Sequence, residues 1–321
     1  MTARHKSPRD EAGLVLALSG GAAAGIAHIG VLQVLEENAI PVRAVVGTSI
    51  GAEIGAFFAS GIPLTELTEL ATAIDWKQTL QLFMPDLTTG GLVSGNKIGD
   101  FLQAQLGDRT IDSLPMAYAA MAVDLETGEQ VVCDQGSLVD AVRASIALPG
   151  LIAPHRINNR WLVDGGILNP VPFDVARERF GGPVLAVAVH AAARRAAQRA
   201  KPTPPSSTWP EQVRQLLSQP WMDRAKGLKT WLEAQLENHQ PEGGKEEWST
   251  RRVLDQSMII AQGEIVRLRT AMNPPDLLLL PDVCDIGPLE FYSGKAAIAA
   301  GRAAAEANLT EIKNLLVAGK N

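Results

Sequence analysis

The chain alternates short apolar runs with stretches whose apolar residues have helical spacing. Residues 14–18 (Leu-Val-Leu-Ala-Leu) and 42–46 are two such runs, and each ends in a turn that contains glycine. These runs predict buried strands. The segment after the first turn repeats its apolar side chains every three positions, at Ile26, Ile29, Leu32 and Leu35. It predicts a helix that ends near Asn38, and residues 50–60 predict another. Two successive units of strand, turn and helix indicate an α/β fold with a mostly parallel central sheet.

The later part of the chain adds strands that are paired by short turns. Residues 117–123 and 130–133 flank a Glu-Thr-Gly turn, which predicts a hairpin. A second hairpin is expected around Asn158-Asn159, before the apolar residues 161–163. The remaining expected elements are buried strands at 184–189 and 277–280 and one Ala-rich terminal helix at 294–316.

The amino-acid composition excludes several classes of protein. The chain has 321 residues, of which 46% are hydrophobic and 20% charged, so it contains enough apolar surface for a large core. Its net charge of -6 disfavours nucleic acid as a partner, because phosphate contacts need clustered positive charge. Cys133 and Cys284 lie far apart, which excludes a disulfide framework and a cysteine-rich zinc site. This cysteine content is typical of a reducing compartment, and we expect a cytoplasmic protein.

The N-terminal region resembles a signal peptide only superficially. Residues 13–35 carry no charged side chain and follow a basic stretch. However, the dense apolar run is five residues long, glycines and polar residues dilute the remainder, and Asp10 and Glu11 interrupt the basic stretch. A strand, a glycine loop and a helix are therefore favoured over a signal peptide or a membrane span, with residues 1–12 as a disordered segment.

Residues 191–250 differ in composition from the rest of the chain. They contain six of the 20 prolines and four of the six tryptophans, and no convincing strand pattern. We interpret them as a helical insertion into a single domain that spans residues 13–317. Two roles remain open for this insertion. It packs on the parent domain, which we favour because insertions need anchoring, or it forms a lid or a peripheral contact with the inner membrane face.

A candidate nucleophile follows the second predicted strand. Residues 47–51 read Gly-Thr-Ser-Ile-Gly between an apolar run and a helix, which is the pattern of a nucleophile elbow. Ser49 would occupy a strained turn, and Gly47 and Gly51 would avoid clashes there because they lack side chains. The helix N-terminus would favour a developing negative charge on the serine oxygen. The alternative is an ordinary N-cap serine.

A loop of small residues follows the first predicted strand and precedes a helix. Residues 19–25 read Ser-Gly-Gly-Ala-Ala-Ala-Gly, which matches neither a P-loop nor a dinucleotide fingerprint. Exposed backbone N–H groups at such a helix N-terminus can bind the oxyanion of a tetrahedral intermediate. The alternative is a loop whose glycines serve only close packing of helix and sheet.

Two kinds of general base are available to Ser49. The chain has five histidines, at positions 5, 28, 155, 190 and 239. His28 precedes Ser49 and is expected to be structural, whereas His190 ends a predicted strand and is the best histidine for a triad. Asp164 also ends an apolar strand, beside Gly165 and Gly166, and a carboxylate can act directly as the base. Spacing alone does not choose between the two.

Together these motifs resemble those of the patatin-like phospholipases. The glycine loop, the elbow and the Asp-Gly-Gly motif occur in the family's order, and residues 144–150 and 161–166 are most similar to small bacterial members related to neuropathy target esterase. The resemblance implies a three-layer α/β/α fold and a Ser49–Asp164 dyad without a catalytic histidine. It also implies oxyanion donors at Gly20, Gly21 and Ala22.

The same resemblance implies a function. It points to hydrolysis of acyl esters in phospholipids, lysophospholipids or related lipids, with no metal and no organic cofactor. The chain departs from the family at Ala24, where Arg or Lys is usual, and at Ala22, which replaces a third glycine. Both changes leave the backbone N–H in place, but the first removes a cation. Two alternatives therefore stay open: a lipid-binding protein with weak or no turnover, and an acyltransferase that uses the same acyl-enzyme.

Overall fold

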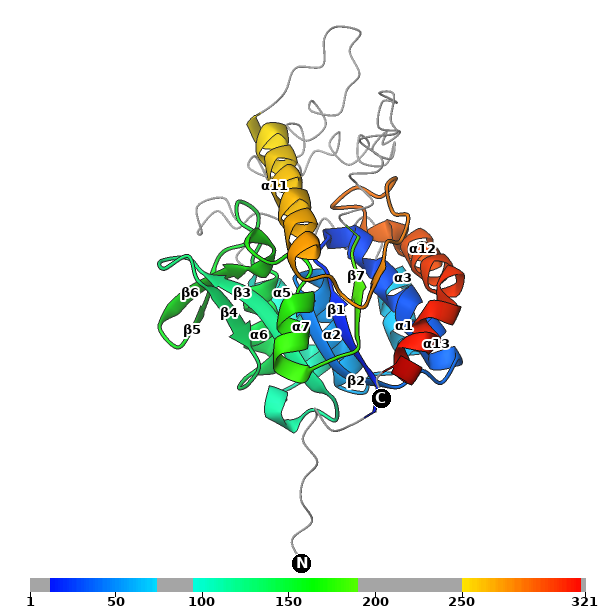
Figure 1. Cartoon of the computed structure of the whole chain (residues 1–321). Helices are drawn as coiled ribbons and strands as arrows, with labels where there is room; N and C mark the ends of the chain where they lie inside the picture. Colours follow the sequence, from blue (N-terminus) through cyan, green and yellow to red (C-terminus); the bar gives the residue numbers. More distant parts are fainter. Residues whose placement is uncertain (1–11, 74–94, 190–249, 319–321) are drawn as a thin grey trace, which may run out of the picture.

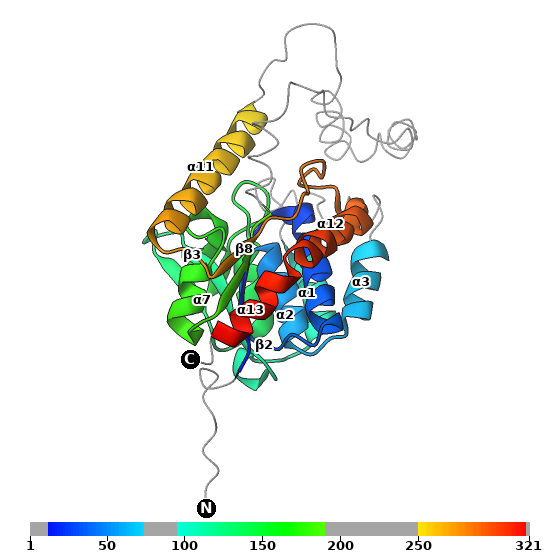
Figure 2. The same ribbon diagram turned by 45° about the vertical axis from the view of Figure 1, so that its right-hand side comes forward.

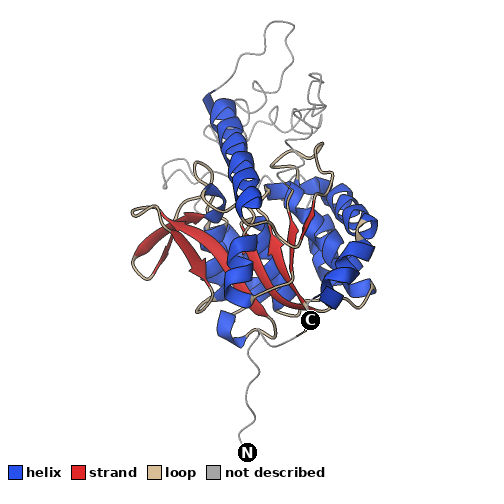
Figure 3. Cartoon of the chain, in the orientation of Figure 1, coloured by secondary structure: helices blue, strands red, loops and turns tan. Residues whose placement is uncertain are grey.

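The computed structural model describes residues 12–73, 95–189 and 250–318, and its centre is a mixed eight-stranded sheet (Figures 1 and 3). The strand order is β5-β6-β3-β2-β1-β7-β8, with β4 paired to β3. The strands are β1 (Leu14–Leu18), β2 (Val42–Thr48), β3 (Ala117–Asp124), β4 (Gln130–Cys133), β5 (His155–Ile157), β6 (Arg160–Asp164), β7 (Val184–Val187) and β8 (Leu277–Leu279).

The parallel part of the sheet is its most buried part. Strands β3, β2, β1, β7 and β8 run parallel, whereas β4, β5 and β6 pair in antiparallel fashion. All five residues of β1 are fully buried, because helices cover both faces of the sheet. This arrangement explains why the strand is a continuous apolar run with no alternation of polar residues.

Helices form a layer on each side of the sheet (Figures 1 and 2). The larger layer consists of α1 (Ala27–Glu37), α2 (Ile50–Ala59), α3 (Leu64–Ala73), α5 (Asn96–Leu106), α6 (Leu138–Ser145), α12 (Gly294–Ala307) and α13 (Leu309–Ala318). On the other side, α7 (Phe173–Phe180) packs on the sheet, and Val266 of the long α11 (Thr250–Met272) joins the same cluster. The fold is therefore the expected three-layer α/β/α arrangement.

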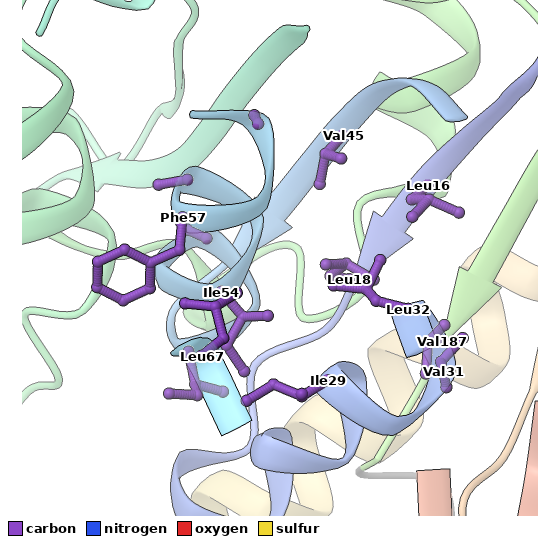
Figure 4. Packing of buried hydrophobic residues seen from close by; sticks show 14 of the residues in the cluster. Leu16, Leu18, Ile29, Val31, Leu32, Val45, Ile54, Phe57, Leu67 and Val187 are labelled. Atoms are coloured by element: carbon purple, nitrogen blue, oxygen red, sulfur yellow. The ribbon is translucent and has the colours of Figure 1, made fainter. Parts of the chain in front are cut away.

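The side chains of β1 divide between the two cores. Leu16 and Leu18 belong to the larger cluster, in which Figure 4 shows them near Leu32 of α1 and Val187 of β7. Val15 and Ala17 belong to the cluster on the side of α7. Side chains of β1 therefore pack against both helical layers. These contacts fix the carboxyl end of the strand, from which the next loop begins.

The sequence-based prediction of one terminal helix at 294–316 is wrong in one respect. The segment forms two helices, α12 and α13, which are separated at Asn308 (φ −115°, ψ 19°). The Asn308 side chain donates a hydrogen bond to the carbonyl of Ala304 at 2.8 Å, and Asn308 O accepts from the Ile312 N–H at 3.0 Å. A short amide side chain that bonds the backbone in this way competes with continuous helix.

Other predictions fall outside the described residues. The N-terminal segment and nearly all of the predicted insertion at 191–250 are in this group, so their roles stay predictions. Within the ranges that the structure does describe, no helix combines the length and apolar content needed to cross a lipid bilayer.

Candidate active site

The predicted nucleophile, Ser49, occupies a strained turn between β2 and α2. Its backbone lies at φ 56° and ψ −127°, a region that residues other than glycine rarely adopt. A methyl group on Gly47 would lie 2.4 Å from the Gly51 carbonyl oxygen, and one on Gly51 would lie 2.3 Å from that of Leu18. Ser49 holds the N-cap position of α2, but its side chain makes no capping hydrogen bond. The elbow interpretation therefore fits better than an ordinary cap.

The register of three strands brings Ser49 and Asp164 together. Thr48, at the end of β2, pairs with Met121 of β3, and the next β3 residue, Ala122, pairs with Asp164 of β6. Because neighbouring strands lie about 4.8 Å apart, the ends of β2 and β6 are separated by roughly 10 Å across β3. Two short side chains can span such a gap, and the Ser49 side chain lies close enough to the Asp164 carboxyl group to lower its pKa.

The Asp164 carboxyl group is buried and accepts a hydrogen bond from the backbone. The residue is 3% exposed, and its Oδ1 accepts the Gly166 N–H at 2.7 Å. Burial raises the pKa of Asp164 to about 6, although Ser49 and the hydrogen bond from Gly166 oppose that rise. Position 165, between Asp164 and Gly166, requires glycine, because a methyl group there would lie 2.5 Å from the Met121 carbonyl oxygen. The pKa of this carboxyl group thus lies closer to neutral pH than that of an ordinary aspartate.

A second serine supports the elbow and carried no signal in the sequence. Ser145, at the end of α6, is fully buried, and its Oγ accepts the Ser49 N–H at 2.9 Å. This bond satisfies a backbone donor that the strained turn would otherwise leave buried and unpaired. Ser145 lies in the segment 144–150 that carries the family resemblance, but nothing in its spacing marks it as a partner of the nucleophile.

A chain of polar contacts connects the elbow to α11. Thr48 Oγ1 donates to the carbonyl of Asn169 at 2.8 Å, and the Asn169 side chain donates to Asp174 at 2.9 Å. Asp174 in turn pairs with Arg269 of α11. The residue before the nucleophile is therefore fixed through α7 to a helix that follows it by about 200 positions in sequence.

The glycine loop packs directly against the elbow. A methyl group on Gly25 would lie 2.1 Å from Cγ2 of Ile50, the residue after the nucleophile. The Gly20 N–H donates to the Pro170 carbonyl at 3.1 Å, so this predicted oxyanion donor is already engaged. Among the described residues, no acceptor is found for the N–H groups of Gly21 (φ 153°) and Ala22 (φ 49°). Of the three predicted donors, these two are available to a ligand.

The described histidines have other partners. His28 is fully buried, and its Nε2–H donates to the Ser19 carbonyl at 2.8 Å, which agrees with the structural role expected of it. His155 bonds Asp140 at 2.8 Å. His190, the best candidate for a triad, lies outside the described residues.

Gln262 of α11 is a further polar residue beside Asp164. It is 7% exposed, and its Nε2 lies 3.0 Å from the point that a methyl group on Gly166 would occupy. The Oδ1 atom of Asp164 lies 3.0 Å from the same point. No sequence pattern indicated this residue, because α11 was not among the predicted elements. Within the described ranges, no three His, Cys, Asp or Glu side chains are grouped so that they could hold a metal ion.

Comparisons with known proteins agree with this architecture. Residues 16–177 match the family model described as patatin-like phospholipase. An uncharacterized NTE family protein of Mycobacterium tuberculosis is 31% identical over 93% of this chain and 91% of its own length. Patatin-like phospholipase domain-containing protein 6 of Mus musculus is 33% identical over 55% of this chain and 13% of its own length.

The solved structures that match include the crystal structure of VipD from Legionella pneumophila. It is 16% identical in sequence, with a TM-score of 0.45 over 95% of this chain and 67% of the other. The match to the family model and the relative that is similar over nearly its whole length decide the assignment. On these two findings, the chain belongs to the patatin-like phospholipase family and is related to the NTE family proteins.

Proposed function

We propose that the protein is a serine acyl hydrolase that cleaves acyl esters of lipids through a Ser49–Asp164 dyad. The observation that carries the proposal is the placement of a serine on a strained turn beside a buried carboxyl group whose pKa it lowers. Membership in a family of phospholipases supports a lipid ester as the substrate. Phospholipids and lysophospholipids are the substrates to test first.

The proposed reaction needs only these two side chains to move protons. As Ser49 Oγ attacks the acyl carbonyl carbon, its proton passes to Asp164, and the carbonyl oxygen becomes an oxyanion. Asp164 then gives that proton to the leaving alcohol, and an acyl-enzyme remains. Water attacks the acyl-enzyme with Asp164 again as the base, which releases a fatty acid and restores Ser49. A base whose pKa is about 6 suits this exchange near neutral pH.

We assign the oxyanion to the amides of Gly21 and Ala22. They follow β1 directly, and the same loop touches Ile50 through Gly25. Each donor of this kind contributes on the order of 3 kcal/mol to transition-state stability. Gly20 would join them only if its bond to Pro170 broke. Peripheral membrane contact through residues 191–250 stays a separate prediction.

The test combines a fluorophosphonate probe with a panel of lipids. Wild-type protein should take up the probe and release fatty acid from at least one phospholipid or lysophospholipid, as measured by mass spectrometry. The Ser49→Ala variant should do neither. Labelling that persists in Ser49→Ala contradicts the assignment of the nucleophile. Binding without labelling or turnover would indicate a lipid-binding protein, and acyl transfer to an added alcohol in preference to water would indicate an acyltransferase.

The pH dependence of ester hydrolysis provides a second prediction. Asp164 acts as a base only when ionised, and burial raises its pKa to about 6. We therefore expect kcat/KM on a soluble ester to fall about tenfold per pH unit below pH 6 and to level off above it.

A matched variant identifies the titrating group. Burial also raises the pKa of Glu53, one turn after Ser49 on α2, to about 7. In the Glu53→Gln variant the fall in kcat/KM should still occur near pH 6. If the fall instead disappears in Glu53→Gln, the titrating group is Glu53 and the role given to Asp164 is wrong.

A further inference from the structure

Arg143 is a buried arginine whose charge is incompletely paired. It lies on α6 and is 4% exposed, and its Nη1 has no hydrogen-bond partner among the residues that the structure describes. No carboxylate of the described residues lies within ion-pair distance of its guanidinium group. Burying such a group without a counterion is costly, and burial lowers the pKa of Arg143.

The guanidinium group lies against the N-terminus of α5. A methyl group on Gly95, the N-cap residue of that helix, would lie 1.9 Å from Nη2 and 2.4 Å from Cζ of Arg143. Gly95 has a left-handed conformation (φ 73°) and supplies no side-chain cap. One turn later, a methyl group on Gly99 would lie 3.8 Å from Cδ and Nε of Arg143. Because positions 95 and 99 carry no side chain, the Arg143 side chain can lie directly against the backbone of α5.

This arrangement places two positive groups together. The N-terminus of an α-helix carries a partial positive charge, which an 11-residue helix such as α5 expresses fully. A guanidinium group in contact with that helix end is repelled unless an anion binds beside both groups. Asp140, one turn earlier on α6, attracts Arg143, but its carboxylate is bound by His155 at 2.8 Å. The local charge is therefore balanced only in part.

We propose that Arg143 and the N-terminus of α5 form a binding site for a phosphate group. Arginine offers several N–H donors in a planar fork that matches phosphate oxygens, and a helix N-terminus adds backbone donors and a favourable dipole. A site built from both has the chemistry to bind an anion, and the bound phosphate would be the counterion that Arg143 lacks among the described residues.

The site is connected to the candidate active site through α6. Arg143 precedes Ser145 by two residues, and Ser145 Oγ binds the N–H of Ser49. Residues two apart on a helix face nearly opposite directions, so Arg143 points to α5 while Ser145 points to the elbow. Two sources of phosphate fit this place: the headgroup of a lipid, which rests on the proposed function, and free phosphate, which does not.

The test is a calorimetric titration of the full-length protein at low ionic strength. Inorganic phosphate and glycerophosphocholine are titrated separately into wild type, and at least one of them is expected to bind at a single saturable site. Tighter binding of glycerophosphocholine identifies a lipid headgroup as the source, and tighter binding of inorganic phosphate identifies the free anion. Either result supports the site, whereas no saturable binding of either probe overturns it.

Variants assign the binding to Arg143. Arg143→Gln should weaken it at least about tenfold, since charge-assisted hydrogen bonds are lost. Arg267→Gln is the control, because it removes the same charge from an exposed pair with Glu264. Equal affinity in folded Arg143→Gln and in wild type overturns the proposal.

Two further variants keep the proposal falsifiable. If Arg143→Gln does not fold, Gly95→Ala decides: it keeps the charge but places a methyl group where the guanidinium lies, and it should also weaken binding. Unchanged binding in folded Gly95→Ala would contradict the site. Ser49→Ala should bind phosphate as wild type does, so the test does not depend on whether the protein is a hydrolase.

Discussion

Asp164→Asn is expected to reduce ester hydrolysis by about 10³-fold or more, because the variant has no base that can accept the Ser49 proton. The change is nearly isosteric, and the amide oxygen can still accept the Gly166 N–H that binds Oδ1 in the wild type at 2.7 Å. The position of Ser49 should therefore be retained. The measurement is kcat/KM on a soluble ester, together with the rate of labelling by a fluorophosphonate probe.

The same variant should be more stable than wild type at neutral pH. The pKa of Asp164 is about 6 in the folded protein and 3.8 for an ordinary aspartate, so the folded state binds more protons between these values. Stability of the wild type consequently falls as pH rises through both pKa values, by about 3 kcal/mol in all and by about 2 kcal/mol between pH 4 and pH 6. The amide side chain of the Asp164→Asn variant does not ionise and avoids this cost. Urea unfolding should show that the free energy of unfolding of Asp164→Asn exceeds that of wild type above pH 6, and that this difference becomes smaller toward pH 4.

Two controls define what would contradict this prediction. Asp124→Asn changes another buried aspartate, which caps the turn after β3 through the amides of Glu126 and Thr127, and it should keep its activity. His190→Ala should also remain active if the protein uses a dyad. Loss of activity in His190→Ala, with Asp164→Asn within about tenfold of wild type, would favour a triad that includes the histidine.

Local pattern was sufficient to predict the elbow and the sheet. The strands at 14–18 and 42–46 are apolar, except for Arg43, because helices cover both faces, and that cause acts within each segment. The residue types around Ser49 follow from the turn itself, since Gly47 and Gly51 face backbone atoms. Inferences of this kind need no knowledge of distant parts of the chain.

Pairings between distant segments could not be predicted from spacing. The contact between Ser49 and Asp164 depends on the register of both β2 and β6 with β3. The bond from the Gly20 amide to Pro170 and the support of Ser49 by Ser145 are also contacts of the folded chain. In these cases the spacing of residues indicated candidate side chains but did not indicate which residues they contact.

The helix α11 was missed for a different reason. Several of its large apolar side chains are exposed, among them those of Leu254, Ile260 and Met272, so its apolar residues do not mark one buried face. A pattern of this kind gives a weak periodic signal. Gln262 could not be predicted without the helix, and its position beside Asp164 became visible only in the folded structure.

Gly51→Ala is expected to destabilise the protein by about 3 kcal/mol and to reduce activity at least about 100-fold. The added methyl group would lie 2.3 Å from the carbonyl oxygen of Leu18 and 2.5 Å from that of Ser19. Both atoms belong to the backbone, at the end of β1 and the start of the glycine loop, so neither can move without displacing the loop that carries the proposed oxyanion donors. Alanine is the better helix former by about 1 kcal/mol, which offsets only part of this cost.

Gly263→Ala is the matched control, because the methyl group that it adds to α11 would meet no heavy atom of the described residues within 4 Å other than the backbone of its own helix. At that position only the higher helix propensity of alanine should matter, and we expect the free energy of unfolding to rise by about 0.5–1 kcal/mol. The two variants therefore separate propensity from packing at the elbow. Urea unfolding gives the stabilities, and hydrolysis of a soluble ester gives the activities. Since the clash at residue 51 involves backbone on both sides, a Gly51→Ala protein with wild-type stability and activity would mean that α2 does not pack against β1 as closely as described.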